Sequence, residues 1–548
     1  MRWLGLIAAL LFALPAAAQG SFPVHITVDA GQSLGPVEPV WRFFGADEAN
    51  YATMKDGKKL LAELGQLSPG HVYFRTHNLF TSGDGTPALK WGSTNIYTED
   101  AKGRPVYDWT IVDRIFDTYL ARGIHPYVEI GFMPEALSTH PEPYQHEWRP
   151  GLDNLKTGWA YPPKDYEKWS ELVYRWTKHC LARYGRTEVA SWYFETWNEA
   201  NLSNIYWGGT REEFFKLHDN TVAAIRRALP EARVGGPDIA GAGDDFLPAF
   251  MAHEDAAGVK DDFVSFHAKG APAVIDDHVR MGIGTQLQVA DKEFSHIQAD
   301  PAFRDKPVII GESDPEGCAA CQGPTNAYRN GTMYASYEAA VFPRLEALAK
   351  RRGLNLQGEL TWAFEFEDQR YFPGFRQLAS NGLPLAVLNV FRMFSQMTGD
   401  HVAAASDHEA ALDDVLNNGV RGEADVGVVA TRDGDRVAIM VWHYHDDDVA
   451  GPAAHITLDL AGLPADWHAA SVVHDRVDGE HSNAYAAWQA MGSPLAPNQA
   501  QYDALEAASA LTPLTPQPES LPVRDGKATL SFDLPRQGVS LLVLSPGN

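Results

Sequence analysis

Apolar runs of strand length alternate with amphipathic segments of helix length from about residue 40 to residue 400. Eight of the runs have the character of buried strands, and they are WRFFGA, HVYFRTH, HPYVEIGF, SWYFETWNE, ARVGGPD, DFVSFHA, KPVIIGE and LQGELTWAF. In one intervening segment Tyr166, Trp169, Val173, Trp176 and Cys180 recur at helical spacing. Strands that alternate with helices favour a parallel sheet, and eight such units close a (β/α)8 barrel. The pattern therefore predicts an α/β fold with a TIM barrel over residues 40–400.

Beyond residue 400 the pattern changes to short strand-like runs separated by Asp-Gly and Gly turns. Examples are VGVVATRDGDRVAIMVWHYHD, AHITLDLAGL, KATLSFDLP and GVSLLVLSP. This pattern predicts an additional all-β sandwich domain over residues 401–548, with a long loop or helix excursion at 480–522. The early run FPVHITVDAG precedes the barrel, and we expect the segment 19–39 to pair with this β domain.

The first residues have the three-part pattern of a secretory signal. Arg2 is followed by an apolar run from Leu4 to Leu14 and then by three alanines at 16–18. The run is too short to span a bilayer, and the whole pattern is typical of a peptide that is removed on export. We therefore expect residues 1–18 to be a signal peptide and the mature chain to be periplasmic or secreted. An uncleaved membrane anchor is the alternative.

The net charge of the chain limits the classes of molecule that the protein is expected to bind. Its 548 residues carry a formal net charge of −26, and the pI is about 5.1. Nucleic acids and anionic membranes are bound through Lys and Arg contacts with phosphate, so this balance argues against both. Charge alone identifies neither the partner nor the oligomeric state.

Three cysteines bear on redox state and metal binding. Cys318 and Cys321 flank the sequence CAAC, which suits a small disulfide-closed loop in an exported protein, half of a metal site, or two free thiols. Because no second CxxC or CxxH follows, we expect the disulfide and no metal. Cys180 lies within a helical pattern and is expected to be a buried free thiol.

Polar side chains gather where the predicted barrel strands end. Glu199 closes SWYFETWNE, Glu312 closes KPVIIGE and His267 closes DFVSFHA, while His77 and Asn78 close HVYFRTHN. Active sites of such barrels form at the carboxyl ends of the strands, so we expect these groups to face one pocket. Two carboxylates on opposite sides of a pocket suit glycoside cleavage. One protonates the leaving oxygen and the other attacks the anomeric carbon.

Further groups near these acids are candidates for binding a sugar. Asn198 precedes Glu199 and is placed to hydrogen-bond a sugar 2-hydroxyl, while Trp362, in LTWAF, is placed to stack on a sugar ring. Three more acids follow that strand, and they are Glu365, Glu367 and Asp368. Glu195 lies farther down its strand and is expected to be paired inside the barrel, because an unpaired buried charge is costly. This chemistry requires no metal and no cofactor.

The motifs around the two glutamates resemble those of a known family. WNEAN resembles the W-N-E-P acid/base motif of the clan of barrel glycosidases, and IIGES resembles its nucleophile motif at strand seven. Together with FRTHNLF, FETWNEANL, DFVSFHAKGA and AYAAWQAMGSPLAPNQAQYDAL, they look like glycoside hydrolase family 39 over nearly all of the mature chain. That family holds β-xylosidases and α-L-iduronidases. The resemblance implies a retaining mechanism with Glu199 as acid/base and Glu312 as nucleophile.

Two positions depart from the family pattern. Ala200 stands where a proline usually follows the acid/base residue, and Lys269 stands where xylosidases usually have a tyrosine. HAKGA and ESDP are more similar to the iduronidase branch, in which a lysine at this place meets the carboxylate of the sugar. The exported chain with a compact β domain looks most like the bacterial β-xylosidases. On that interpretation Lys269 pairs with Glu365, Glu367 or Asp368 and closes the pocket against larger sugars.

The sequence therefore predicts a retaining, exo-acting glycoside hydrolase that releases xylose from xylo-oligosaccharides. The alternative activities in the same fold are those of an α-L-iduronidase or an arabinosidase. The alternative from another class is a carbohydrate-binding barrel that has lost catalysis. Loss of either catalytic glutamate would signal that case, and both Glu199 and Glu312 are present.

Overall fold

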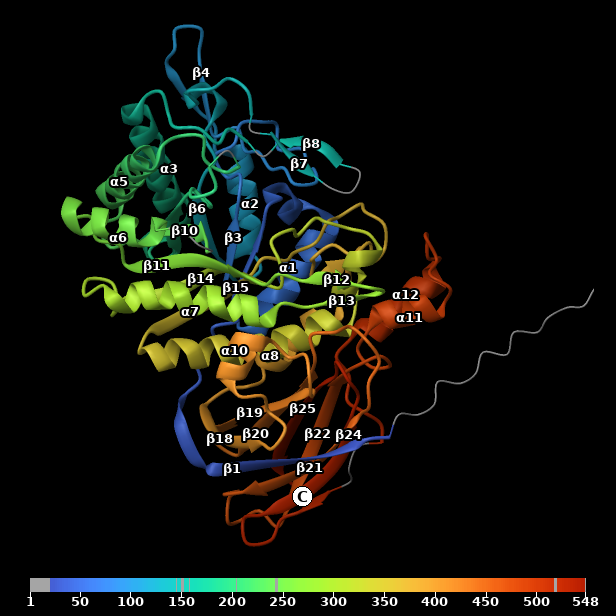
Figure 1. Ribbon diagram of the computed structural model, residues 1–548. Coiled ribbons are helices and arrows are strands. Elements are labelled where there is room, and N and C mark those ends of the chain that lie inside the picture. The colour runs from blue at the N-terminus through green and yellow to red at the C-terminus, as the bar shows by residue number, and fades with distance from the viewer. Residues whose placement is uncertain are drawn as a thin grey trace, which may run out of the picture.

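The computed structural model describes residues 20–143, 145–148, 152–156, 158–203, 205–241, 245–516 and 520–547, and its centre is a closed barrel (Figure 1). The barrel strands are β2 (Phe43–Ala46), β3 (Val72–Thr76), β6 (Ile124–Ile130), β9 (Tyr193–Thr196), β10 (Arg233–Ala240), β11 (Phe263–Lys269), β14 (Pro307–Asp314) and β15 (Asn355–Thr361). Each pairs in parallel with the next, and β15 pairs with β2 to close the ring. The predicted TIM barrel is confirmed, and its strands overlap the eight apolar runs.

Helices cover the outside of the barrel (Figure 1). The longer ones are α1 (Lys55–Leu67), α2 (Thr110–Leu120), α3 (Tyr166–Tyr184), α5 (Arg211–Ala228), α6 (Phe246–Ala257), α7 (Ile283–Ala299), α8 (Thr332–Arg352) and α9 (Ala386–Phe394). α5 begins with a capping box, in which Thr210 Oγ1 accepts from the Glu213 amide and the Glu213 carboxylate accepts from the Thr210 amide. α3 buries Trp169, Val173 and Trp176 along the stripe that the periodic pattern predicted.

Shorter elements lie in the connections. They are η1 (Ala49–Thr53), β4 (Tyr97–Glu99), β5 (Pro105–Tyr107), η2 (Glu135–Leu137), β7 (Gln145–Trp148), β8 (Leu152–Lys156), α4 (Arg186–Val189), β12 (Ala273–Ile275), β13 (His278–Arg280), η3 (Pro324–Asn330), β16 (Ala379–Ser380) and β17 (Leu383–Pro384). β4 pairs with β5, β7 with β8, β12 with β13 and β16 with β17, each antiparallel. The β12–β13 hairpin and η3 follow β11 and β14, so they belong to the loops at the carboxyl end of the barrel.

A second domain is built on one continuous mixed sheet. Its strand order is β23 (Leu521–Pro522), β22 (Ala469–Val477), β25 (Val539–Pro546), β20 (Arg436–Tyr444), β19 (Asp425–Asp433), β18 (Asp400–Ser406), β1 (Phe22–Pro36), β21 (Ala454–Ala461) and β24 (Ala528–Leu534). β1 pairs antiparallel with β18 and parallel with β21, so the N-terminal strand lies between two strands from the far end of the chain (Figure 1). The sheet has its own apolar core, which includes Val24, Ile26, Ile439, Leu458 and Leu542.

The excursion of the β domain returns to the barrel. It carries α11 (Ala484–Ala490) and α12 (Gln499–Ser509), whereas α10 (Leu412–Asn418) lies between β18 and β19. Lys59 Nζ on α1 donates to Glu506 Oε1 at 2.8 Å, and the Tyr502 hydroxyl donates to the Asn381 carbonyl at 3.1 Å. These contacts hold the excursion against the barrel, which accounts for a helical segment inside a β domain.

The predicted signal peptide, residues 1–18, lies outside the described residues, so its removal and the export of the chain stay predictions. Among the residues that are described, no helix has both the length and the apolar character needed to cross a membrane.

Candidate active site

Two glutamates from different strands meet at the carboxyl end of the barrel. Glu199 follows β9, and Glu312 lies near the end of β14. A carboxylate oxygen of each and a ring nitrogen of His267 lie within 4.8 Å of one another. The side chains of Glu199 and Glu312 are 13% and 7% exposed, so both carboxylates are shielded from bulk water. Their separation lets both acids act on one bond of a bound substrate.

The chain turns sharply at the end of β9 to present Glu199. Trp197 has a φ of 71° and Glu199 a φ of 44°, in the left-handed region that side chains other than glycine rarely adopt. The Glu199 amide donates to the Asp238 carbonyl at 3.0 Å, and Trp197 Nε1 donates to the Tyr206 carbonyl at 2.7 Å. Backbone strain of this kind persists only where surrounding contacts hold it, and it clusters at functional sites. These bonds therefore fix Glu199 at the pocket.

His267 on β11 links the two glutamates electrostatically. Its Nδ1 lies 2.7 Å from Glu199 Oε1 and 3.8 Å from Glu312 Oε1, and its Nε2 lies 2.8 Å from Asp238 Oδ2. Burial lowers the pKa of this imidazole, but Asp238 and Glu312 outweigh burial and raise the pKa to about 10. His267 is therefore an imidazolium near neutral pH, and it donates one hydrogen bond to Glu199 and one to Asp238.

Glu312 is surrounded by cations. Lys269 Nζ donates to its Oε2 at 2.5 Å, and Arg75 Nη1 donates to its Oε1 at 3.5 Å. Burial on its own raises the pKa of Glu312, but the charges of His267 and Lys269, with those of His77 and Arg75, hold that pKa well below its usual range. Glu312 is therefore ionised at any working pH, as a carboxylate nucleophile must be.

Lys269 has a different second partner from the one expected. The register of β11 against β14 places His267 beside Glu312 and Lys269 beside Asp314. Lys269 Nζ donates to Asp314 as well as to Glu312, and its side chain is 17% exposed. Asp314 is closer because it lies on the neighbouring strand, two residues beyond Glu312. The lysine is thus neutralised within the β11–β14 pair.

Two of the three acids that follow β15 bind backbone amides elsewhere and the third is exposed, so the predicted pairing of Lys269 with Glu365, Glu367 or Asp368 is wrong. A backbone amide donates to Glu365 Oε1 at 2.6 Å. Amides in the first turn of α1 donate to Glu367 at 3.0 and 3.1 Å, which caps that helix. Asp368 is exposed and has a φ of 60°. The side chains of Glu365 and Glu367 thus hold backbone segments, and the structure does not join them to the two glutamates.

Arg75 on β3 is a central cation of the site, and sequence reasoning missed it. Its buried Nε donates to Glu195 Oε2 at 2.7 Å. Its Nη2 lies 3.1 Å from Glu129 Oε2, 3.1 Å from Asn198 Oδ1 and 2.5 Å from Asp238 Oδ2. The predicted internal pairing of Glu195 is confirmed. A charged residue within each apolar run of β3, β6, β9 and β10 was the available signal, because buried charges need partners.

A free donor and an aromatic face lie beside the acids. Asn198 Nδ2 is buried and has no hydrogen-bond partner within the described part of the chain, which agrees with the predicted contact to a sugar hydroxyl without testing it. His77 Nδ1 lies 2.8 Å from Asp47 Oδ1, and its ring centroid is 4.3 Å from that of Trp362. A Cβ at Gly45 on β2 would lie 2.4 Å from carbons of the Trp362 ring. Glycine at that position therefore makes room for the indole.

Asn78 shapes a loop instead of offering a ligand. It has a φ of 64°, its Nδ2 donates to the Asp47 carbonyl at 3.1 Å, and its Oδ1 accepts from Thr81 Oγ1 at 2.9 Å. Both ends of the amide are used within the protein, so the expected contact of Asn78 with a sugar is not supported. The same loop brings Lys90 to Asp47 as an ion pair.

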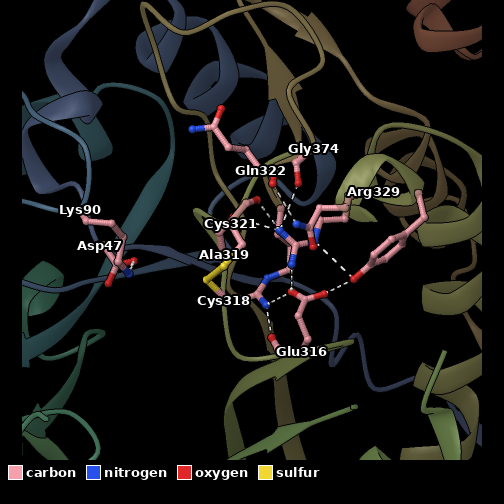
Figure 2. The surroundings of a disulfide bond; sticks show 12 residues. Asp47, Lys90, Glu316, Cys318, Ala319, Cys321, Gln322, Arg329 and Gly374 are labelled. Atoms are coloured by element: carbon pink, nitrogen blue, oxygen red, sulfur yellow. Dashed lines mark hydrogen bonds and ion pairs between the residues drawn. A yellow bond between two sulfur atoms is a disulfide. The ribbon is translucent and has the colours of Figure 1, made fainter. Parts of the chain in front are cut away.

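A disulfide closes the loop that follows β14. Cys318 and Cys321 are bonded, with their Cα atoms 5.5 Å apart, so the predicted bridge is confirmed. Arg329 ties this loop down, since its Nη1 donates to the Cys321 carbonyl at 2.9 Å and its Nη2 lies 3.1 Å from Glu316 Oε1 (Figure 2). Cys180 is free and buried, as predicted.

Paired carboxylates at the mouth of a barrel, one of them held ionised, define a glycoside hydrolase of the barrel class. The chain belongs to the glycosyl hydrolases family 39, whose family model matches residues 24–527. The fold and the family resemblance read from the sequence are both confirmed by this match.

Relatives with different substrates cover most of the chain. A β-xylosidase of Geobacillus stearothermophilus is 27% identical over 521 residues, which span 92% of this chain and 92% of the relative. An α-L-iduronidase of Mus musculus is 24% identical over 572 residues, which span 94% of this chain and 79% of the relative. The crystal structure of a monomeric β-xylosidase from Caulobacter crescentus CB15 matches with a TM-score of 0.76 at 25% identity, covering 96% of this chain and 100% of that one.

Proposed function

We propose that the protein is a retaining, exo-acting β-xylosidase that releases xylose from xylo-oligosaccharides. The spacing of Glu199 and Glu312 supports retention, because oxygens of the two carboxylates lie within 4.8 Å. Retaining glycosidases hold their carboxyl groups about 5–5.5 Å apart, whereas inverting enzymes need about 6.5–9.5 Å to admit a water molecule. The shorter spacing leaves the anomeric carbon within reach of Glu312 itself.

The reaction proceeds in two displacements. In the first, a carboxylate oxygen of Glu312 bonds to the anomeric carbon while the glycosidic C–O bond breaks and the leaving oxygen takes the proton of Glu199. In the second, Glu199 accepts a proton from water, which displaces Glu312 and releases the sugar. His267 Nδ1 donates to Glu199 Oε1, which leaves the other oxygen of Glu199 to carry the proton. Lys269 keeps Asp314 as a partner when Glu312 becomes an ester and loses its charge.

The ion pair of Lys269 is the observation that carries the choice of xylose. A xylosyl ring has no substituent at C5, so a lysine in its pocket must be neutralised by the protein. Lys269 contacts the carboxylates of both Glu312 and Asp314. A uronic acid would bring a further carboxylate to an ammonium group that is already paired. The arrangement therefore favours a neutral pentose.

A lysine at this position also motivates the second candidate, an α-L-iduronidase, with arabinosidase activity as a further variant in the same fold. In the iduronidase branch the corresponding lysine is expected to meet the carboxylate of the sugar, and two mammalian α-L-iduronidases align with most of this chain. A binding protein without catalysis would not need both glutamates at reacting distance.

Rates on p-nitrophenyl β-D-xyloside, p-nitrophenyl α-L-arabinoside and an aryl α-L-iduronide separate these functions. The proposal predicts the highest kcat/KM on the xyloside. It also predicts a loss of no more than about tenfold in Lys269→Met, since His267 and Arg75 remain beside Glu312 and the lysine has no substrate group of its own to bind. Glu312→Ala provides the inactive control. Much faster hydrolysis of the iduronide, with that advantage erased in Lys269→Met, would show that the xylosidase assignment is wrong and the iduronidase branch is right.

A further inference from the structure

A second cluster of ligand-type side chains lies away from the two glutamates. His218 is on α5, Glu254 is on α6 and Asp261 is in the loop between α6 and β11. Their exposed fractions are 0%, 0% and 1%, and one ligand atom of each lies within 4.8 Å of the others. Because β11 begins at Phe263, Asp261 lies at the amino end of the strand that carries His267 near its carboxyl end. The cluster is therefore separate from the catalytic pocket.

Much of the polar surface of this cluster lacks protein partners. Both carboxylate oxygens of Glu254, Oδ2 of Asp261 and Nδ1 of His218 have no hydrogen-bond partner among the described residues. The ring of Phe250 packs edge-on against His218, with centroids 4.9 Å apart, so the surroundings are partly apolar. Burying a carboxylate without a partner is costly. Glu254 Oε1 lies at ion-pair distance from His218 Nε2, but Glu254 Oε2 and Asp261 Oδ2 have neither a hydrogen bond nor an ion pair among the described residues, which indicates room for a further positive ligand.

The distances within the cluster are compatible with metal coordination. His218 Nε2 lies 3.2 Å from Asp261 Oδ1, within hydrogen-bond distance, and 3.5 Å from Glu254 Oε1. In a tetrahedral site with bonds of about 2.0–2.2 Å to zinc, ligand atoms lie about 3.3–3.6 Å apart. By contrast, His267 contacts its two carboxylates at 2.7 and 2.8 Å, within the range of charge-assisted hydrogen bonds. The two contacts of His218 are thus longer than those of His267 and close to the spacing of ligand atoms around a zinc ion.

The charges in the cluster are compatible with a divalent cation. One divalent ion balances two carboxylates, so a site made of a neutral imidazole with Glu254 and Asp261 would carry no net charge. The buried oxygens of both acids would then have a positive partner.

We propose that His218, Glu254 and Asp261 bind one divalent transition-metal ion, with zinc as the best match, and that this ion ties α5 and α6 to the start of β11. A ligand set of one imidazole and two carboxylates suits zinc, and the second oxygen of Glu254 is available to complete the coordination. Because the cluster is buried, the ion enters as the chain folds. It takes no part in the hydrolysis of glycosides.

Metal content tests the site directly. The tag-free chain is produced in medium supplemented with zinc, desalted, and measured by inductively coupled plasma mass spectrometry. We expect about one zinc per wild-type chain and a nearly complete loss in both Glu254→Gln and Asp261→Asn, which keep the shape of each side chain but remove a charged ligand. His253→Gln is the matched control on α6, since His253 pairs with Asp219 at 3.1 Å and is 30% exposed. That variant should keep the zinc.

Thermal unfolding provides the second readout. Removal of zinc by a strong chelator during refolding should lower the unfolding midpoint of the wild type by at least about 2 °C and leave that of Glu254→Gln unchanged. If Glu254→Gln does not fold, Asp261→Asn serves in its place. A wild-type chain without zinc, or variants that carry as much zinc as the wild type, would overturn the proposal.

Discussion

The positive charge of His267 leads to a quantitative prediction for the free energy of unfolding. The variant His267→Gln keeps a side chain that can donate one hydrogen bond but removes the imidazolium between Glu199 and Asp238. The pKa of this buried imidazole rises from an ordinary value of 6.5 to about 10 on folding. At about 1.4 kcal/mol for each pKa unit, the folded environment stabilises the charged form by about 5 kcal/mol. The variant should lose a contribution of that order at pH 6.

The stabilisation by His267 depends on pH, and the sign of that dependence follows from the rise of its pKa on folding. A group whose pKa is higher in the folded than in the unfolded chain contributes its full stabilisation below the unfolded value of 6.5. The contribution then falls by about 1.4 kcal/mol for each pH unit and is lost above a pH of about 10. The gap in unfolding free energy between wild type and His267→Gln should therefore narrow by about 4 kcal/mol between pH 6 and pH 9.5.

Urea unfolding at several pH values, followed by tryptophan fluorescence, measures this gap. Comparing the two proteins at each pH cancels the groups that titrate in both. His253→Gln serves as the control, because a partly exposed ion pair contributes no more than about 1 kcal/mol and cannot produce a gap of this size. A gap for His267→Gln that stays constant from pH 6 to pH 9.5 would refute the assignment of a buried imidazolium.

Three further variants test other contacts of the site. Glu199→Ala should lower kcat/KM on xylobiose by about 10²- to 10⁴-fold but affect glycosylation by an aryl xyloside with a good leaving group much less, and an equal loss on both would count against the acid role. Gly45→Ala should lower kcat/KM on aryl xylosides because its Cβ would lie 2.4 Å from the Trp362 ring, and unchanged kinetics would show that the indole position does not matter. Arg75→Gln leaves the surrounding carboxylates without their cation and should lower the unfolding free energy by about 3–5 kcal/mol in urea, whereas a loss under 1 kcal/mol would contradict the network.

The barrel could be predicted from the sequence because each of its strands is an apolar run bounded by a helical pattern. Eight such units leave few other architectures for a parallel sheet. The same reasoning located Glu199, Glu312 and His267, because strand ends share one face of the barrel. The position of β1 could also be predicted, since a single strand before the barrel must pair with strands of another sheet.

The charge network could not be predicted in the same way, because it depends on which strands are neighbours and in what register. The sequence shows two pairs with a spacing of two residues, His267 with Lys269 and Glu312 with Asp314. Only the register of β11 against β14 shows that these pairs lie side by side. Without it, an acid after β15 looked an equally good partner for Lys269. Arg75 was missed for a related reason, since its partners come from four other strands.

Trapping the covalent intermediate tests the central claim most directly. A 2-deoxy-2-fluoro-β-xyloside with a good leaving group forms the glycosyl-enzyme faster than water releases it, because the fluorine disfavours the oxocarbenium-like transition states of both steps and the leaving group speeds only the first. Peptide mass spectrometry of the inactivated protein then locates the sugar. The account predicts one fluoroxylosyl group per chain, in an ester with Glu312. A label on Glu199 or another residue, or turnover to the inverted anomer with no label, would contradict it.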